Sequence, residues 1–211
     1  MATADPPLPG VRETLLVAAR AELAERGHAA ISLRAVARRA GVSHAAPKYH
    51  FRDRAGLLTA IAVEGFAALA EALRRVGEPD AEQHLAALGR AYVDFGLTKP
   101  ALFDLMFRPT ELHPDDPVLH QARRDAIDPL RAAVARLGTC DDASPESSPL
   151  TLISWAFVHG LVVLTRDNAL QTGAEPAGLA AAGLAHELTD LFSAYVGRGQ
   201  GTLPRRPGRG P

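Results

Sequence analysis

The fold is decided by the stretch from Ser32 to Arg54, SLRAVARRAGVSHAAPKYHFRDR. Its first half places apolar residues at the spacing of one helical face, namely Leu33, Val36, Ala37 and Ala40. Ser32 precedes this face as an N-cap residue, Gly41 ends it, and Ser43 caps a second short helix through about Tyr49. Two short amphipathic helices joined by a glycine turn predict a helix-turn-helix, in which the second helix enters the major groove of DNA.

The competing interpretation of this stretch is an ordinary helical corner with a solvated charged face. The distribution of charge favours the first interpretation. From Gly10 to Gly56, nine basic residues stand against four acidic ones, a net charge of +5, whereas Leu57 to Gly197 carries a net charge of −9. The last fourteen residues contain four arginines and no acid. Because charge asymmetry reports on partners, it predicts a polyanion partner for the basic N-terminal segment.

The rest of the chain is also helical, since apolar residues recur at three and four and no long run alternates with the period of a strand. The first helix is expected from Val11 to Arg26, where Gly27 ends it. Asp53 caps a long helix, and the later helices are expected at Arg54–Val76, Asp80–Thr98, Pro100–Phe107, Pro117–Leu137, Pro149–Gln171 and Glu175–Val196. We therefore predict an all-α fold of about nine helices.

The domain organisation is predicted in four segments. A disordered N-terminus (1–10) precedes a three-helix helix-turn-helix DNA-binding domain (11–56), a larger helical ligand-binding and dimerisation domain (57–197) and a disordered basic tail (198–211). A flexible loop is expected at Gly138–Ser148. The near-continuous apolar run Leu152–Leu164 is shorter than the roughly 18 residues of a membrane helix, so we expect a cytoplasmic protein without a membrane span.

No catalytic or metal-binding motif is found in the sequence. Cys140 is the only cysteine, which excludes an intramolecular disulfide, and the neighbouring Asp141 and Asp142 disfavour its thiolate. No Cys/His cluster has zinc spacing, and no phosphate loop, zinc-protease helix or Ser/His/Asp arrangement is found. We expect no enzyme, no metal and no cofactor. The alternative to a ligand-responsive regulator is an effector-independent architectural DNA-binding protein, against which the large acidic domain argues.

Aromatic residues are scarce but gather in the middle of the chain. Trp155 and His159 are four residues apart and share a helix face, which supplies an apolar lining with one group that titrates near neutrality. This favours a pocket for an apolar or aromatic small molecule, although core packing explains the same residues. The candidate ligand-binding residues are Phe66, Leu69, Tyr92, Phe95, Phe103, Met106, Phe107, Trp155 and His159.

Two C-terminal segments, Leu152–Leu164 and Leu184–Tyr195, are too apolar to face water. One face of each is needed for the core of the chain itself, which leaves a second apolar face for a partner helix. We therefore expect a homodimer, with interface candidates Leu161, Leu164, Leu184, Leu188, Leu191 and Phe192.

On these residues the sequence resembles the TetR/AcrR family of transcriptional regulators. The resemblance rests on the first helix with its Gly27 stop, Ile31–Ser32, the run AVARRAGVS, the following Tyr/His/Phe cluster and the long helix after it. The later segments KPALFDLMF and WAFVHG resemble the C-terminal domain of the subgroup named for a Trp-His-Gly signature, here Trp155, His159 and Gly160. The resemblance implies an all-helical homodimer that binds a palindromic operator in double-stranded DNA as a repressor, and that a small-molecule effector releases.

The resemblance also assigns roles to the residues of the decisive stretch. It places Ser43–Tyr49 in the recognition helix, and Ser32 and Arg34 at the phosphate-facing start of the supporting helix. Lys48 replaces the family's phosphate-binding tyrosine, which is displaced to Tyr49, and Pro47 predicts a short or slightly unwound recognition helix. The candidate DNA-binding residues are Ser32, Arg34, Ser43, His44, Ala45, Ala46, Lys48, Tyr49, His50 and Arg54.

Among these candidates, the base-edge contact is expected from His44. Ala45 and Ala46 have no hydrogen-bonding group, so they can only contact a thymine methyl or permit close approach. Arg54 matches the basic residue that opens the family's fourth helix, where it meets a phosphate.

Overall fold

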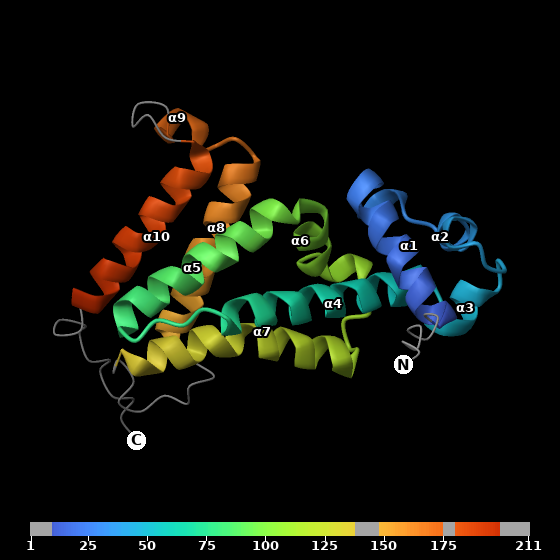
Figure 1. Cartoon of the computed structure of the whole chain (residues 1–211), viewed down its shortest axis with the longest axis horizontal. Helices are drawn as coiled ribbons and strands as arrows, with labels where there is room; N and C mark the ends of the chain where they lie inside the picture. The colour runs from blue at the N-terminus through green and yellow to red at the C-terminus, as the bar shows by residue number, and fades with distance from the viewer. Residues whose placement is uncertain (1–9, 138–147, 175–179, 199–211) are drawn as a thin grey trace, which may run out of the picture. The chain divides into compact units, whose positions relative to one another are not determined.

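The computed structural model describes residues 10–137, 148–174 and 180–198 (Figure 1). The predicted disordered N-terminus, the predicted flexible loop and the predicted basic tail lie outside these residues, apart from Gly10, Ser148 and Arg198 at their edges. Cys140 also lies outside them.

Every regular element in the described part of the chain is a helix, which confirms the all-α prediction. The structure has ten α-helices and two 3₁₀-helices there: α1 Val11–Arg26, η1 His28–Ala30, α2 Leu33–Ala40, α3 Ala46–Phe51, α4 Arg54–Arg74, α5 Ala81–Thr98, α6 Pro100–Met106, η2 Pro109–Glu111, α7 Pro117–Arg136, α8 Pro149–Arg166, α9 Gln171–Ala174 and α10 Ala181–Arg198. The predicted number of about nine is exceeded because α9 is a separate helical turn.

The chain folds as two compact units. Among the described residues, unit 1 comprises 10–68 and 99–124, and unit 2 comprises 69–98, 125–137, 148–174 and 180–198. Helices α1, α2, α3 and α6 therefore belong to unit 1, whereas α5, α8, α9 and α10 belong to unit 2. The continuous helices α4 and α7 contribute residues to both units.

Unit 1 is built around the first half of α4. Its residues Leu57, Leu58 and Ile61 are fully buried with Leu15 and Leu16 of α1. The N-terminus of α4 is capped as predicted, because the backbone N–H of Gly56 donates to the Asp53 carboxylate over 2.8 Å. At Gly65, α4 and α6 approach so closely that a Cβ atom would lie 2.7 Å from the sulfur of Met106.

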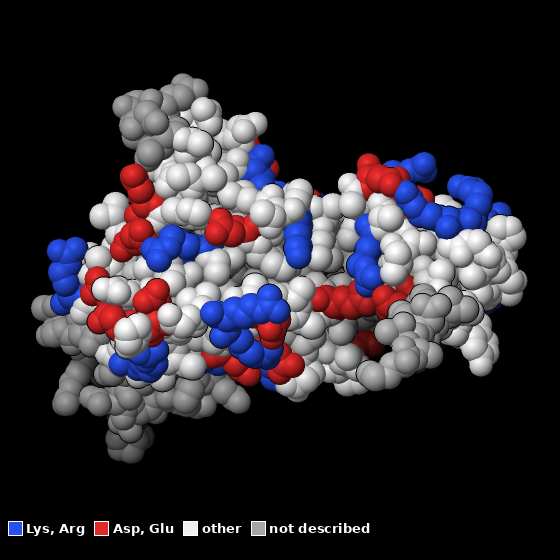
Figure 2. Space-filling model, in the orientation of Figure 1, with Lys and Arg blue, Asp and Glu red and all other residues white. Residues whose placement is uncertain are grey.

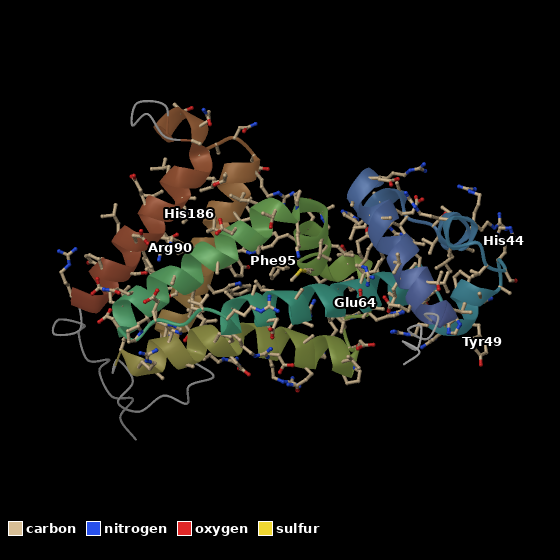
Figure 3. The ribbon with its side chains drawn as sticks, viewed as in Figure 1. His44, Tyr49, Glu64, Arg90, Phe95 and His186 are labelled. Carbon is tan, nitrogen blue, oxygen red and sulfur yellow. The ribbon has the colours of Figure 1, made fainter. Side chains whose placement is uncertain are left out.

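Unit 2 is a bundle in which α5 packs against α8 and α10 (Figure 1). Two polar pairs join α5 to α10: Arg90 pairs with Asp190, and His186 Nε2 lies 2.9 Å from Asp94. The partners are matched in reverse order along the two helices, so α5 and α10 run antiparallel; Figure 3 labels Arg90 and His186 on them.

The start of α3 differs from the prediction. Ser43 does not cap the helix, which begins at Ala46; its hydroxyl instead accepts a hydrogen bond from the backbone N–H of Ala45 over 3.3 Å. The physical reason is Pro47, which lies in the first turn of α3, where its missing N–H has no helical partner to lose. Helix α3 has six residues, so it is short, as predicted for this position.

The end of α8 also differs from the prediction, which extended this helix to Gln171. It stops at Arg166 because Asn168 adopts a left-handed backbone conformation, with φ of +56°. The N–H of Asn168 donates to the carbonyl of Thr165 over 3.2 Å, and that of Ala169 donates to the carbonyl of Leu164 over 2.9 Å. This pair of bonds is a Schellman cap with asparagine in the position usually held by glycine. Helix α10 begins at Ala181, and the predicted start at Glu175 lies outside the described residues.

Gly89 is the point at which the three main helices of unit 2 meet. A Cβ atom on Gly89 would clash with a methyl group of Thr189 in α10 and would lie 3.3 Å from a methyl group of Val158 in α8. Thr189 cannot rotate away cheaply, because it is buried and its hydroxyl donates to the carbonyl of Ala185 over 2.8 Å. The packing of α5 on α10 therefore requires glycine at this position.

We expect Gly89→Ala to lower the free energy of unfolding by about 1–3 kcal/mol through overpacking. Gly160→Ala is the matched control in α8, because nothing lies within 4 Å of its Cβ position. That substitution should be neutral or raise stability by up to about 1 kcal/mol through helix propensity. Urea unfolding followed by circular dichroism measures both values, and an equal effect of the two variants would contradict the assignment.

Candidate nucleic-acid interface and ligand region

The helix-turn-helix forms as the sequence predicts. The hydroxyl of Ser32 accepts a hydrogen bond from the backbone N–H of Ala35 over 3.2 Å and so caps α2. Gly41 ends α2 in the left-handed conformation, with φ of +66°. Val36 and Ala37 are fully buried and hold α2 against the rest of the unit. The turn between α2 and α3 thus has the backbone that only glycine adopts at low cost.

The surface of α3 and of the turn before it carries most of the predicted DNA-binding residues. Tyr49 is 85% exposed and, like His44, projects from the edge of unit 1 in Figure 3. The exposed candidates are Ser32, Arg34, Ser43, His44, Ala45, Lys48 and Tyr49, while Ala46 and His50 are half-buried. Phe51, on the opposite face of α3, is buried beneath the guanidinium of Arg12, which lies 5.4 Å from its ring centre.

Two groups of cations can be distinguished within residues 11–56. The first group is neutralised by α1 and α4: Arg39 binds Glu22 over 2.8 Å and also Glu25, and Arg20 binds Glu64 over 2.6 Å. The hydrogen bond from Arg39 lowers the pKa of Glu25, so this carboxylate stays charged at neutral pH.

The second group has no ion-pair partner among the described residues. Its members are exposed on α2, on α3 and just after α3: Arg34, Arg38, Lys48 and Arg52. Figure 2 shows basic side chains gathered over α2. Because these four cations form no ion pair within the described part of unit 1, this surface attracts a polyanion.

Arg54 lies at the first position of α4 and its guanidinium is largely engaged within unit 1. It donates to the backbone carbonyl of Ile31 over 3.0 Å, to that of His28 over 2.7 Å and to the carboxylate of Glu111 over 2.6 Å. Neither Glu111 nor His28 was singled out from the sequence. No local pattern could identify them, because they are 57 and 26 residues away from Arg54.

The predicted ligand-binding residues fall into both units. In unit 1, the ring of Phe107 lies 5.5 Å from that of Phe66 and 4.9 Å from that of Phe103, and Met106 is fully buried beside Gly65. Leu69, Tyr92, Phe95, Trp155 and His159 belong to unit 2.

Trp155, His159 and Tyr92 form a hydrogen-bonded cluster in unit 2. The rings of Trp155 and His159 are 5.9 Å apart, as expected for residues that share a helix face. The indole N–H of Trp155 donates to the hydroxyl oxygen of Tyr92 over 3.2 Å, and this oxygen lies 2.9 Å from Nδ1 of His159. Burial raises the pKa of Tyr92 and lowers the pKa of His159, so both groups are neutral near pH 7.

Helices α8 and α10 expose apolar side chains. Leu191 is 63% exposed and Leu164 is 44% exposed, whereas Leu161 is only 4% exposed and packs inside unit 2. Leu184, Leu188 and Phe192 are half-buried, and the ring of Phe192 stacks on that of Phe157 at 4.5 Å. Further exposed residues of these helices, which the sequence-based candidate set lacks, are Leu152, Ile153, Val163 and Tyr195. Their spacing along α8 could have identified one face of that helix.

In the part of the chain that the structure describes, two helices, α4 and α8, are long and apolar enough to cross a membrane by length and composition alone. The apolar window of α4 is 56% buried, as in the core helix of a soluble protein, but that of α8 is only 28% buried. The run Leu152–Leu164 is shorter than a membrane span, as predicted, whereas the whole of α8 reaches 18 residues. Helix α8 therefore exposes an apolar face, which consists of Leu152, Ile153, Val163 and Leu164. Within the described ranges, no group of three or more His, Cys, Asp or Glu side chains could hold a metal ion.

Comparison with known proteins identifies the class of this chain. A family model described as bacterial regulatory proteins of the tetR family matches residues 15–61, and one described as a tetracyclin repressor-like C-terminal domain matches residues 85–187. The helix-turn-helix and its charged surface lie within the first match. The chain is thus a DNA-binding transcriptional regulator, and it belongs to the TetR family. Its resemblance to the Trp-His-Gly subgroup stays a prediction.

Solved structures show the same fold over most of the chain. The chain is 31% identical to a protein with unknown function from Rhodococcus sp. RHA1, with a TM-score of 0.74 over 90% of this chain and 98% of that one. It is 18% identical to the TetR family transcriptional regulator PfmR from Thermus thermophilus, with a TM-score of 0.54 over 87% and 97% of the two chains. A regulatory protein of the tetR family from Rhodococcus RHA1 gives 17% identity and a TM-score of 0.56 over 90% and 96%. No curated protein sequence matches the chain.

We expect Lys48→Ala to weaken binding to all duplexes alike, because the exposed ammonium group has no base-specific geometry. The slope of the logarithm of the binding constant against the logarithm of salt concentration should fall by about one unit. Arg75→Ala is the control, since it removes an exposed cation that pairs with Glu71 outside residues 11–56. Fluorescence anisotropy measures both, and a changed preferred sequence would assign Lys48 to base readout instead.

Proposed function

We propose that this protein is a ligand-released repressor that binds a palindromic operator as a homodimer. The observation that carries the proposal is the surface of α2, α3 and the residue after α3, where Arg34, Arg38, Lys48 and Arg52 are exposed and have no ion-pair partner among the described residues. These positive charges supply affinity for the phosphate backbone of DNA, and the side chains of α3 and of the turn before it supply contacts to bases.

Each candidate on this surface takes a role according to its chemistry. Arg34, Lys48 and Tyr49 contact phosphates. Ser32 supports these contacts from the N-cap of α2, Ser43 from the turn before α3, and His50 from the half-buried side of α3. His44 contacts a base edge, with Ala45 and Ala46 allowing close approach. A guanidinium has five N–H groups, so Arg54 keeps two beyond its three internal bonds, and these meet a phosphate.

The homodimer follows from the apolar face of α8 and α10. A second copy covers Leu164, Leu191 and their exposed neighbours in a two-fold arrangement, in which the same residues of both copies meet. The half-buried Leu184, Leu188 and Phe192 form the edge of this contact, and Leu161 supports it from the core. Two recognition helices related by this axis read half-sites about 34–36 Å apart. Coverage by a second copy, rather than by lipid, is consistent with action on DNA in the cytoplasm.

The effector acts at the cluster of Tyr92, Trp155 and His159 in unit 2. The cluster is neutral and largely apolar, which suits an apolar or aromatic molecule with one polar group. An effector lowers DNA affinity only if it binds better to a conformation whose helix-turn-helix pair is wrongly spaced. Helices α4 and α7 both contribute residues to the two units, and α4, which directly follows the helix-turn-helix in the chain, is the element through which such a preference is transmitted.

We expect Leu191→Glu to convert the dimer into monomers that have lost operator affinity. Leu191 is 63% exposed in one copy, so the new charge costs nothing inside the protomer but is buried at a dimer interface. Val118→Glu is the matched control, because Val118 is 58% exposed on α7 in unit 1. Sedimentation velocity without detergent measures both, and a monomeric wild type would refute the dimer.

We expect Trp155→Ala to abolish the response to effector while leaving operator affinity near its normal value. A coupling of about 1–3 kcal/mol corresponds to a 5–150-fold change in DNA affinity, and the variant should lose that change. Trp155 is the only tryptophan, so its fluorescence reports occupancy directly. If no apolar metabolite in a broad screen alters this fluorescence or DNA affinity, the protein is an effector-independent DNA-binding protein instead.

A further inference from the structure

The segment between α6 and α7 contacts two other parts of unit 1, the start of α4 and the turn between α1 and α2. It contains η2, and it presents Glu111 and His113 to residues that are distant in sequence. Glu111 binds Arg54 at the start of α4, and the ring Nδ1 of His28 lies 3.9 Å from the same carboxylate. One acidic side chain thereby joins the α6–α7 segment to the helix-turn-helix region.

His113 makes a second attachment next to the first. Its backbone N–H donates to the hydroxyl of Thr59 in α4 over 2.9 Å, and its ring Nε2 lies 3.0 Å from the Asp53 carboxylate. Thr59 is buried, so this contact is shielded from water. The α6–α7 segment is therefore bound to α4 at its cap Asp53, at its first residue Arg54 and at Thr59.

The orientation of α3 depends on the segments that this attachment holds. Arg52 ends α3 with φ of +66°, and Asp53 and Arg54 follow it directly. At Gly56, a Cβ atom would clash with the carbonyl oxygen of Phe51, so the end of α3 is packed tightly on the first turn of α4. Through the carbonyls of His28 and Ile31, Arg54 also holds the turn that leads into α2.

We propose that Glu111 is a positioning residue for DNA binding, which acts by fixing the Arg54 guanidinium against the turn between α1 and α2. The proposal rests on the DNA-binding function and adds to it a residue outside the helix-turn-helix. Glu111 contacts no DNA. It sets the relative placement of α2 and α3, and hence the phosphates and bases that their side chains contact.

Electrostatics and positioning predict opposite signs for the removal of this acid. Loss of a negative charge near a DNA-binding surface, taken alone, increases affinity for the polyanion. Loss of the positioning contact decreases affinity, because the recognition helix no longer has its binding orientation fixed before contact. A comparison with another acid on the same segment therefore separates the two effects.

The experiment compares Glu111→Gln with Asp115→Asn. Asp115 lies on the same segment, is exposed, and has no ion pair among the described residues, so the two variants change the net charge equally. In free protein, we expect faster amide hydrogen exchange at residues 28–32 and 46–54 in Glu111→Gln only. Unchanged exchange in these segments would overturn the proposal without any DNA present.

The second readout is affinity for the duplex that the wild-type protein selects from a random library. We expect Glu111→Gln to bind it about 5-fold or more weakly, with the salt slope unchanged, and Asp115→Asn to bind it as tightly as wild type or tighter. Equal or higher affinity of Glu111→Gln would overturn the proposal. If wild type selects no duplex, the DNA-binding function fails instead, and hydrogen exchange alone still decides whether Glu111 positions α2 and α3.

A double-mutant cycle tests whether Glu111 acts through Arg54. Arg54→Lys keeps the positive charge but loses the fork that reaches three acceptors. We expect Glu111→Gln to have no further effect on affinity in the Arg54→Lys background. Additive effects of the two substitutions would overturn this route, and urea unfolding of each variant identifies any general loss of stability.

Discussion

The guanidinium of Arg54 is the interaction on which unit 1 depends. It joins the turn before α2, the first position of α4 and the segment after α6, three parts of the chain that no local sequence contact would bring together. A planar group with donors in fixed directions can meet two carbonyls and a carboxylate simultaneously, whereas an ammonium group cannot do so with the same geometry. Arg54 follows α3 in the chain and binds the carbonyls of His28 and Ile31, which precede α2. The helix-turn-helix is thus held at both of its ends, and its two short helices do not depend on their own packing alone.

Polar pairs within each unit involve some of its charged side chains and leave other side chains exposed. Glu22, Glu25 and Glu64 neutralise the arginines on the side of α1 and α4, where positive charge would have no partner. The remaining cations on α2 and α3 are exposed and form no ion pair among the described residues. In unit 2 the polar pairs between α5 and α10 fix the antiparallel packing, and the apolar side chains remain on the outer face of α8 and α10. The cationic surface of α2 and α3 and the apolar face of α8 and α10 stay exposed because other side chains make the contacts that hold each unit together.

Local signals in the sequence predicted most of the helices, since a cap such as Ser32 or Asp53 and a turn such as Gly41 act over three or four residues. The start of α3 was missed because the effect of Pro47 outweighed the capping preference of Ser43. The end of α8 was missed because asparagine adopts the left-handed conformation less often than glycine, so Asn168 gave only a weak stop signal. The Glu111 contact depends on pairing across 57 residues, and no periodicity encodes it. Helical spacing relates Trp155 to His159 but relates neither to the other aromatic residues of the ligand-binding set, and the members of that set divide between two units.

The short side chains at the start of α3 limit how much information the protein can read from bases. In the turn just before α3, Ser43 has a short side chain whose hydroxyl accepts a bond from the backbone, and His44 carries the longer polar group. Ala45 and Ala46 offer only methyl groups. With the base contacts proposed above, a half-site has few strictly required bases, so many sequences in a genome satisfy it. Discrimination then comes from the width and flexibility of the grooves and from the simultaneous fit of two half-sites at one spacing. The groove geometry and the spacing between the half-sites therefore define the operator of such a protein more than its base sequence does.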